Sequence, residues 1–382
     1  MPYSRGSIFS PELELLLSIL RNSECPATTA TRNWESFSTL VEHHRVAPLV
    51  QARITQRPIS DFPGSQAARL GAVVSTNARR ALGVAAAQIR TVRRLENAGV
   101  ETLSLKGLGL ALRFYGSPGG RHIGDIDLLA RPTDVARADA LLREDGWERV
   151  IPDFPLSPRQ SEEYLRLKPE FEYRHRADTL RLDLRWKLGG LATVEDALAR
   201  AVTGQFSGHS VRTLPADLEA LYLFHHGARH GWYRLFWLVD VAHVLRDPGF
   251  DAEATLYAAR AVDCDRALLH GAALAEELLG VSCPPAVRPT ARDRPHLRRL
   301  VADARRMIAR RPQKHEGVAE WLRRFAYRLR LRRRAHGRFA AAAPHLFSPT
   351  TWRTAPLPDR WFFPYDPLTP MVWIWRGLWQ RP

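Results

Sequence analysis

The sequence predicts an α+β fold, in which a small strand-rich segment is embedded in a largely helical chain. Apolar residues recur at helical spacing throughout residues 1–99, and they do so again from about residue 194. Between these regions, apolar and polar residues alternate in "VETLSL" (residues 100–105) and in "RLDLRWKL" (residues 181–188), as they do in half-buried strands. The expected order is therefore helices, then a group of strands, then helices.

The N-terminal elements are expected to be helices. Ser10 is a suitable N-cap, and Pro11 occupies the first helical position, where a proline costs no hydrogen bond. Helical spacing continues through residues 33–55 and 67–97, and Gly99 is expected to end the last of these helices.

The central segment is expected to alternate strands with short helices. A strand at residues 100–105 leads into a helix that ends at Gly116, and "HIGDIDLLA" (residues 122–130) forms the second strand. A helix begins at Pro132, and "WERVI" (residues 147–151) is the expected third strand.

The remaining elements are expected from simpler patterns. Residues 152–169 are rich in proline and predict a loop, and two strands then flank Ala177-Asp178 as a hairpin. The later expectations are a short strand in "HSVRTLP" (residues 209–215), helices over 215–246, 252–280, 295–310 and 316–335, and an irregular tail from residue 340.

These patterns divide the chain into four regions. The expected regions are an N-terminal helical region (1–99), an α/β core (100–192), a C-terminal helical region (193–340) and an irregular tail rich in Pro and Trp (341–382).

The chain is strongly basic, with 56 Lys and Arg residues against 40 Asp and Glu residues and a formal net charge of +16. Such a charge favours anionic partners, namely nucleotides, nucleic acid or a membrane surface. Cys25, Cys264 and Cys283 lie far apart, which fits neither a disulfide framework nor a zinc motif. Without a signal-peptide pattern or an apolar run of bilayer length, we expect a cytoplasmic protein with no transmembrane segment.

Two aspartates, Asp125 and Asp127, interrupt an otherwise apolar strand in "RHIGDIDLLA" (residues 121–130). Residues two apart share one face of a strand, so both carboxylates point the same way. They repel each other unless a cation lies between them, and Mg²⁺ prefers oxygen ligands of this kind. The pair therefore predicts a Mg²⁺ platform, and the apolar neighbours disfavour the alternative of a solvated strand edge.

Three neighbouring features strengthen this prediction. Lys106-Gly107 precedes a helix, whose N-terminus offers free backbone N–H groups to a phosphate. Arg121 is a candidate phosphate clamp. Asp183, on a later strand, is a candidate third metal ligand.

Each candidate also has a plainer interpretation. On this interpretation Asp183 faces solvent and pairs with Arg181 or Arg185, and Lys106 is a strand-end lysine in water. These alternatives remain open from the residues alone.

Two further patterns have metal or nucleic-acid interpretations beside structural ones. His226 and His230 are four residues apart, which places both rings on one face of a helix. One interpretation is a metal site that includes Asp240. The preferred interpretation is that the two histidines pack in the core or line a substrate site. The segment "WLRRFAYRLRLRRRAHGR" (residues 321–338) places arginines opposite an apolar helical face. A solvated basic face is the default interpretation, and nucleic-acid or anionic-membrane contact is the alternative.

The order of three motifs resembles a known superfamily. "LSLKGLGLALRFY" (103–115), "RHIGDIDLLARPTDVARADALLREDGW" (121–147) and "RLDLRWKL" (181–188) resemble the nucleotidyltransferases typified by DNA polymerase beta. They more closely resemble a bacterial group of uncharacterised nucleotidyltransferases with LKG, R-x-x-x-D-I-D-L-L and a later D-L-H-W-like strand. "HHGARHGWYRLFWLVDVAHVL" (225–245) resembles the helical region of the same group, so the resemblance covers about residues 40–250.

The resemblance implies a small mixed β-sheet nucleotidyltransferase core with helices on one side. It implies that Asp125, Asp127 and Asp183 are the catalytic carboxylates that hold two Mg²⁺ ions, with Asp183 as the candidate base. The nucleotide-binding residues would be Lys106, Gly107 and Arg121. The implied reaction transfers a nucleoside monophosphate from an NTP, with ATP as the expected donor. The acceptor is open: a small molecule, a peptide or protein, a sugar or RNA.

The chain departs from the family pattern at two places. Lys106-Gly107 stands where Gly-Ser is usual, and Arg185 stands where His is common in the D-L-H-W strand. The second departure argues against a proton relay at that position. Two other functions therefore stay in view: a non-catalytic nucleotide-binding protein on the same fold, and a basic nucleic-acid-binding module.

Overall fold

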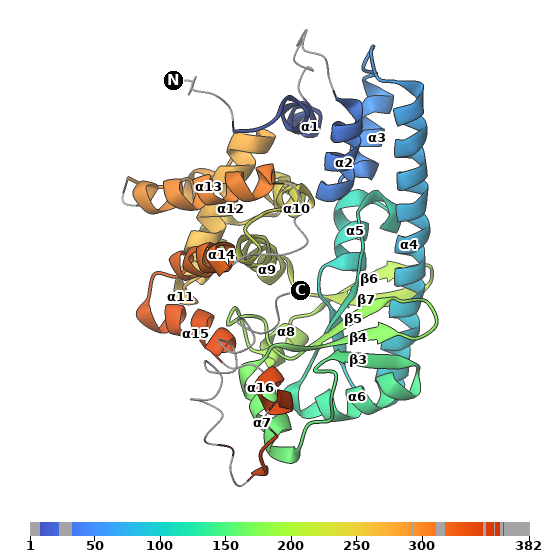
Figure 1. Cartoon of the computed structure of the whole chain (residues 1–382), viewed down its shortest axis with the longest axis vertical. Helices are drawn as coiled ribbons and strands as arrows, with labels where there is room; N and C mark the ends of the chain where they lie inside the picture. Colours follow the sequence, from blue (N-terminus) through green and yellow to red (C-terminus); the bar gives the residue numbers. More distant parts are fainter. Residues whose placement is uncertain are drawn as a thin grey trace.

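A seven-stranded mixed β-sheet lies beside a large group of helices, which confirms the predicted α+β class (Figure 1). The computed structural model describes residues 8–22, 33–291, 293–310, 318–346, 349–354, 356–359 and 362. Within this described part of the chain, no helix is both long enough and apolar enough to cross a lipid bilayer.

The N-terminal region consists of helices, as predicted. They are α1 (Pro11–Arg21), α2 (Trp34–His44), α3 (Ala47–Gln56) and α4 (Gly64–Asn97). The Ser10 hydroxyl accepts a hydrogen bond from the Leu13 amide at 3.3 Å, so it caps α1 as its sequence position predicts. α4 is the longest helix of the described chain, and it runs along one side of the molecule over most of its height (Figure 1).

The strands pair in the order β3-β4-β5-β2-β1-β7-β6. Their bounds are β1 (Thr102–Ser104), β2 (Ile126–Ala130), β3 (Trp147–Ile151), β4 (Glu170–His175), β5 (Arg181–Arg185), β6 (Val202–Phe206) and β7 (His209–Thr213). β2 is parallel to β5 and β1 is parallel to β7, whereas the other neighbours are antiparallel. β6 was not predicted, because its exposed residues and Gly204 give no apolar alternation.

Short helices connect the strands. They are α5 (Gly107–Tyr115), α6 (Val135–Glu144), α7 (Pro158–Leu167) and α8 (Val194–Ala199). The prediction of a loop over residues 152–169 is wrong, because α7 lies within it. Ser157 and Gln160 form a capping box around Pro158, and the buried Tyr164 ring packs 5.0 Å from Phe171, so the helix has both a start signal and a packed face.

The C-terminal region is helical. Its helices are α9 (Ala216–Arg229), α10 (Leu235–Arg246), α11 (Ala252–Ala261), α12 (Asp265–Leu279), α13 (Arg294–Ala309), α14 (Val318–Arg330), α15 (Ala335–Leu346) and α16 (Pro349–Thr354). The helical stretch predicted over 215–246 breaks between α9 and α10, where Gly231 and Trp232 adopt positive φ angles of 65° and 56°. The tail predicted to be irregular from residue 340 begins inside α15 and includes α16.

The four-region division stays a prediction. The sheet itself continues past residue 192 through β6 and β7, and α15 continues past residue 340.

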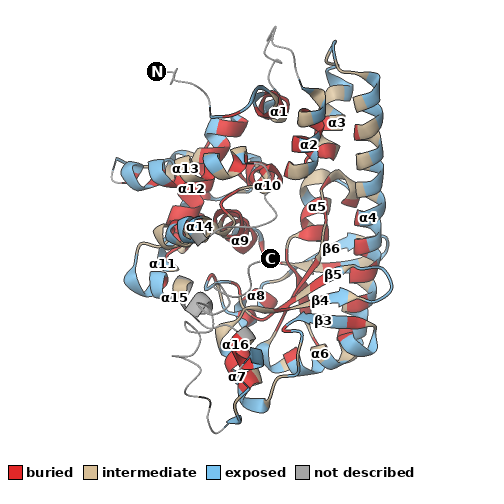
Figure 2. Cartoon of the chain, in the orientation of Figure 1, coloured by how far each residue is buried: buried red, intermediate tan, exposed pale blue. Residues whose placement is uncertain are grey.

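The sheet has one apolar face and one polar face. Its apolar face packs against α4 and α6 in a single core, to which β2 and β5 contribute Ile126, Leu128, Leu182 and Leu184. Because strand side chains alternate, Asp127 and Asp183 point to the other face, toward the C-terminal helices. A second core joins α1, α9, α10 and α12, and Figure 2 shows these C-terminal helices buried over most of their length. The polar face of the sheet therefore lies between the core on the opposite face of the sheet and the core of the C-terminal helices.

One residue of the second core makes stability depend on pH. His270 of α12 is fully buried, accepts a hydrogen bond from the Trp232 indole at 3.3 Å and lies 3.4 Å from the Tyr327 hydroxyl. Burial lowers the pKa of His270 from 6.5 to about 3. The unfolded chain therefore takes up a proton below pH 6.5 that the folded chain does not, and stability falls as the pH falls toward 3.

We expect His270→Asn, which keeps an acceptor near the indole but cannot titrate, to flatten this dependence. Between pH 7 and pH 5 the wild-type chain should lose about 2 kcal/mol more unfolding free energy than the variant does. Urea unfolding at the two pH values measures the difference. Equal losses in the two proteins would show that His270 does not contribute.

Candidate active site

The pairing of β2 with β5 brings the three predicted carboxylates together. Asp127 and Asp183 are direct register partners in this parallel pair, and Asp125 lies just before β2. One ligand oxygen from each of Asp125, Asp127 and Asp183 lies within 4.8 Å of the other two. We call these three residues the aspartate trio.

Two cations lie against the aspartate trio. The Lys106 ammonium is 2.7 Å from Asp127 Oδ2, and Arg185 Nε is 3.4 Å from Asp127 Oδ1. Arg185 also lies 3.7 Å from Asp183 and forms an ion pair with Glu170 of β4. The plainer interpretation of Asp183, pairing with Arg185, is thus partly realised, although Arg185 is shared among three carboxylates.

Burial and mutual repulsion disturb the acid–base behaviour of the trio. Asp127 is 3% exposed, and burial raises its pKa, whereas Lys106 lowers the pKa of Asp125. Burial, followed by repulsion from Asp127, raises the pKa of Asp183 to about 8. The site thus disfavours the full negative charge of three ionised carboxylates, and a divalent cation would remove that penalty.

The turn between β1 and α5 forms the second part of the site. Lys106 and Gly107 both have positive φ angles, of 52° and 56°, and α5 begins at Gly107. The Leu105 amide donates to the Asp127 carbonyl at 3.0 Å, so this turn is fixed beside β2. The free N–H groups at the start of α5 therefore lie next to the aspartate trio, where they suit a phosphate. The Lys106 side chain faces Asp127 rather than water.

The structure pairs the side chain of Arg121, the predicted phosphate clamp, with Asp240. Its Nε and Nη2 atoms donate to the two carboxylate oxygens of Asp240 at 2.8 and 2.7 Å, and Nη1 donates to the His122 carbonyl. The Tyr115 hydroxyl donates to the same carboxylate at 2.8 Å. Arg121 is 5% exposed, and its guanidinium is occupied by this pairing. Through Asp240, Arg121 joins the loop before β2 to α10, and Tyr115 joins α5 to the same helix.

A family model described as "uncharacterised nucleotidyltransferase" matches residues 30–280. The chain belongs to this family of uncharacterised nucleotidyltransferases. The matched part contains the aspartate trio, the Lys106-Gly107 turn and the helices α9 and α10. No curated protein matches the chain.

The two histidines that also had a metal interpretation pack against each other and against Trp237, and His230 in addition lines a cavity. The rings of His226 and His230 lie 4.7 Å apart, and both contact Trp237, at 5.5 and 5.0 Å. Asp240, their suggested partner, is bound to Arg121. Within the described residues, the aspartate trio is the one group of three acidic, His or Cys side chains arranged for a metal ion.

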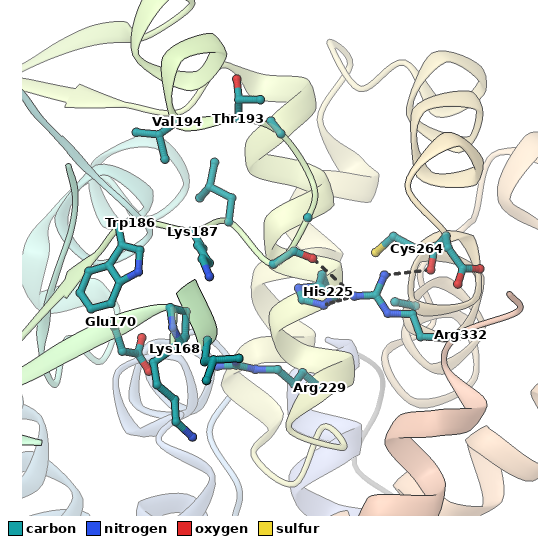
Figure 3. Close-up of a pocket in the computed structure, with 18 of the residues that line it drawn as sticks. Lys168, Glu170, Trp186, Lys187, Thr193, Val194, His225, Arg229, Cys264 and Arg332 are labelled. Atoms are coloured by element: carbon teal, nitrogen blue, oxygen red, sulfur yellow. Dashed lines mark hydrogen bonds between the residues drawn. The ribbon is translucent and has the colours of Figure 1, made fainter. Parts of the chain in front are cut away.

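A large cavity beside the site was not predicted. Its volume is about 980 Å³, and its walls come from β4, the segment after β5, α8, α9, α12, α14 and α15. Glu170 lines the cavity and also forms an ion pair with Arg185, which contacts the aspartate trio. Figure 3 shows Lys168, Glu170 and Trp186 along one wall and His225, Cys264 and Arg332 along the opposite wall. The Gly189-Gly190 pair after β5, with φ angles of 68° and 80°, is the sequence signal that marks this turn.

Proposed function

We propose that this family member is a Mg²⁺-dependent nucleotidyltransferase that moves a nucleoside monophosphate from an NTP to an acceptor, with ATP as the expected donor. The aspartate trio, with ligand atoms within 4.8 Å of one another, is the observation that supports this most. Membership of the nucleotidyltransferase family supports nucleotidyl transfer as the reaction class.

The trio has the chemistry that a hard divalent cation requires. Asp125 just before β2, Asp127 from β2 and Asp183 from β5 would hold two Mg²⁺ ions through carboxylate oxygens. When bound, Mg²⁺ would neutralise phosphate charge and activate the acceptor oxygen. The start of α5 at Gly107 would bind phosphate oxygens through its N–H groups, and Lys106 adds positive charge at the same place.

The proposed reaction is a single displacement at phosphorus. The acceptor atom forms a bond to the α-phosphorus, and the bond from that phosphorus to the oxygen bridging to the β-phosphorus breaks. Pyrophosphate leaves with the bonding electron pair. The acceptor proton passes to a base, for which Asp183 is the candidate because β5 lies between β2 and β4, the strand that lines the cavity through Glu170.

The other two functions are weaker candidates. A non-catalytic nucleotide-binding protein would bind NTP without turnover. A nucleic-acid-binding module would use the basic segment 321–338, but part of its charge is already paired, since Arg330 contacts Asp303 and Arg333 contacts Asp265 and Asp293. The buried free thiols of Cys264 and Cys283 support a reducing, cytoplasmic setting as part of the proposal.

The test separates binding from chemistry. We expect α,β-methylene-ATP, which cannot release pyrophosphate, to bind at least tenfold more tightly with Mg²⁺ than with EDTA, because the metal bridges carboxylates and phosphates. Calorimetry measures this affinity without an acceptor. With ATP, Mg²⁺ and acceptor the product should be pyrophosphate. Formation of ADP would change the reaction class, and nucleotide affinity that ignores Mg²⁺ would contradict the metal site.

A further inference from the structure

The cavity adjoins the aspartate trio on one defined side. In the sheet order, β2 has β1 on one side and β5 and then β4 on the other. Lys106 and Gly107 follow β1, whereas the cavity takes Glu170 from β4 and Trp186 and Lys187 from the segment after β5. The phosphate-binding turn and the cavity therefore lie on opposite sides of the carboxylates on β2.

The cavity is cationic. Its basic lining residues are Arg166, Lys168, Lys187, Arg229, Arg328 and Arg332, against the acidic residues Glu170, Glu195 and Asp263. Two of these three carboxylates are already engaged, since Glu170 pairs with Arg185 and Asp263 accepts from the Arg333 and Arg334 amides. The lining thus carries an excess of positive charge within a partly apolar enclosure.

Arg229 is a lining cation that Glu170 and Asp183 compensate only from a distance. It lies at the end of α9, and within the described residues its guanidinium forms no ion pair with a carboxylate. Burial and the nearby Arg185 lower the pKa of Arg229, and burial also lowers the pKa of Lys168 and Lys187. In contrast, Arg332 is bound to the Gly189 carbonyl and to His225, so it holds the wall together. A half-buried cation without an ion-pair partner is costly, and a bound anion would relieve that cost.

We propose that this cavity binds the acceptor and that the acceptor is a small molecule or short peptide carrying a carboxylate or phosphate group, which contacts Arg229 and the nearby lysines. A volume of about 980 Å³ suits a molecule of that size. The acceptor's nucleophilic end would face Asp183 while its anionic end stays at Arg229. The assignment as an acceptor site rests on the proposed transfer reaction, whereas the anion binding does not.

Two fluorescent dyes that differ by one charge test the anion binding directly. 8-Anilinonaphthalene-1-sulfonate is anionic, and N-phenyl-1-naphthylamine is the same molecule without the sulfonate. We expect the wild-type protein to prefer the anionic dye, and Arg229→Gln to weaken that preference roughly tenfold, because a charge-assisted contact is lost. Arg229→Lys, which keeps the charge, should retain most of the preference.

Arg90→Gln is the matched control, since Arg90 is exposed on α4, on the other side of the sheet, and carries the same charge. It should leave the preference for the anionic dye unchanged. Equal binding of the two dyes by the wild-type protein, or equal effects of the Arg229 and Arg90 variants, would overturn the proposal. Displacement of the anionic dye by benzoate or by phenyl phosphate distinguishes a carboxylate acceptor from a phosphate acceptor. If a short RNA displaces the anionic dye and neither small anion does, the cavity is a nucleic-acid site and not an acceptor site for a small molecule.

This experiment contains neither Mg²⁺ nor NTP, so its outcome is independent of the transfer reaction. If Arg229→Gln lowers the dye preference and no nucleotidyl transfer occurs, the anion site stands and the proposed function fails. If transfer occurs and the dye preference does not respond to Arg229, the acceptor binds elsewhere.

Discussion

Asp127→Asn should reduce pyrophosphate release by about a hundredfold or more and should abolish the Mg²⁺ dependence of α,β-methylene-ATP binding. Asparagine keeps the shape and one oxygen of the side chain but loses the anion that would hold the cation. The same change should leave the melting temperature without Mg²⁺ equal or higher, because burial already raises the pKa of Asp127 and Asp125 remains beside Lys106. Pyrophosphate detection, calorimetry and thermal unfolding measure the three quantities.

Glu172→Gln is the matched control. Glu172 lies on the same face of the sheet and is the register partner of Asp183 on β4, but it is outside the aspartate trio. Its removal deletes the same charge from the same face and should change pyrophosphate release by less than about threefold. If pyrophosphate release falls equally in both variants, the total negative charge of this face of the sheet, and not the aspartate trio, determines the rate. Wild-type turnover by Asp127→Asn would refute the metal platform.

Asp240→Leu should destabilise the protein by about 3–5 kcal/mol, because it leaves the buried Arg121 guanidinium without its carboxylate. The pair joins the loop before β2 to α10, so its loss also weakens the contact between the sheet and the helices that cover its polar face. Chemical unfolding measures the change. A loss below about 1 kcal/mol would show that water reaches Arg121 and replaces the carboxylate.

The triple variant Tyr115→Phe, Arg121→Met, Asp240→Leu removes all three polar side chains of this cluster at once and should recover most of the lost stability, since an apolar set of similar volume can replace a buried ion pair. It also distinguishes the two roles considered for Arg121. If Arg121 holds the fold through Asp240, the refolded triple variant keeps its affinity for α,β-methylene-ATP. If Arg121 binds phosphate, that affinity falls although stability returns.

Local patterns in the sequence predicted the part of the site that depends on strand geometry. The two-residue spacing of Asp125 and Asp127 puts both side chains on one face wherever the strand lies, and the leucines around Asp183 define its face in the same way. The structure adds the register, which places Asp127 beside Asp183. Their convergence therefore needed a pairing between strands more than fifty residues apart, which the family resemblance implied and strand periodicity alone did not.

The features that sequence reasoning missed depend on distant contacts. Arg121 looks like a phosphate ligand because it precedes the aspartates, yet its partner Asp240 lies 119 positions later on α10. The cavity takes its walls from segments spread between Pro132 and Phe339, so no local pattern describes it. α7 was missed for another reason, because its prolines obscured a capping signal at Ser157 and Gln160 that was present in the sequence.

The opposite characters of the two faces of the sheet have a consequence for how the chain avoids misfolding. If β5 paired with β2 one residue out of place, its side chains would exchange faces. Asp183 and Arg185 would then enter the apolar layer against α4, and Leu182 and Leu184 would lie among the carboxylates. The first error buries unpaired charges in an apolar layer, and the second places apolar side chains among charged groups, so each shifted pairing is penalised twice. The residues proposed to hold the metal thus also disfavour wrong alignments, and replacing Asp127 and Asp183 together by leucine would yield a sheet that is free to pair in more than one way.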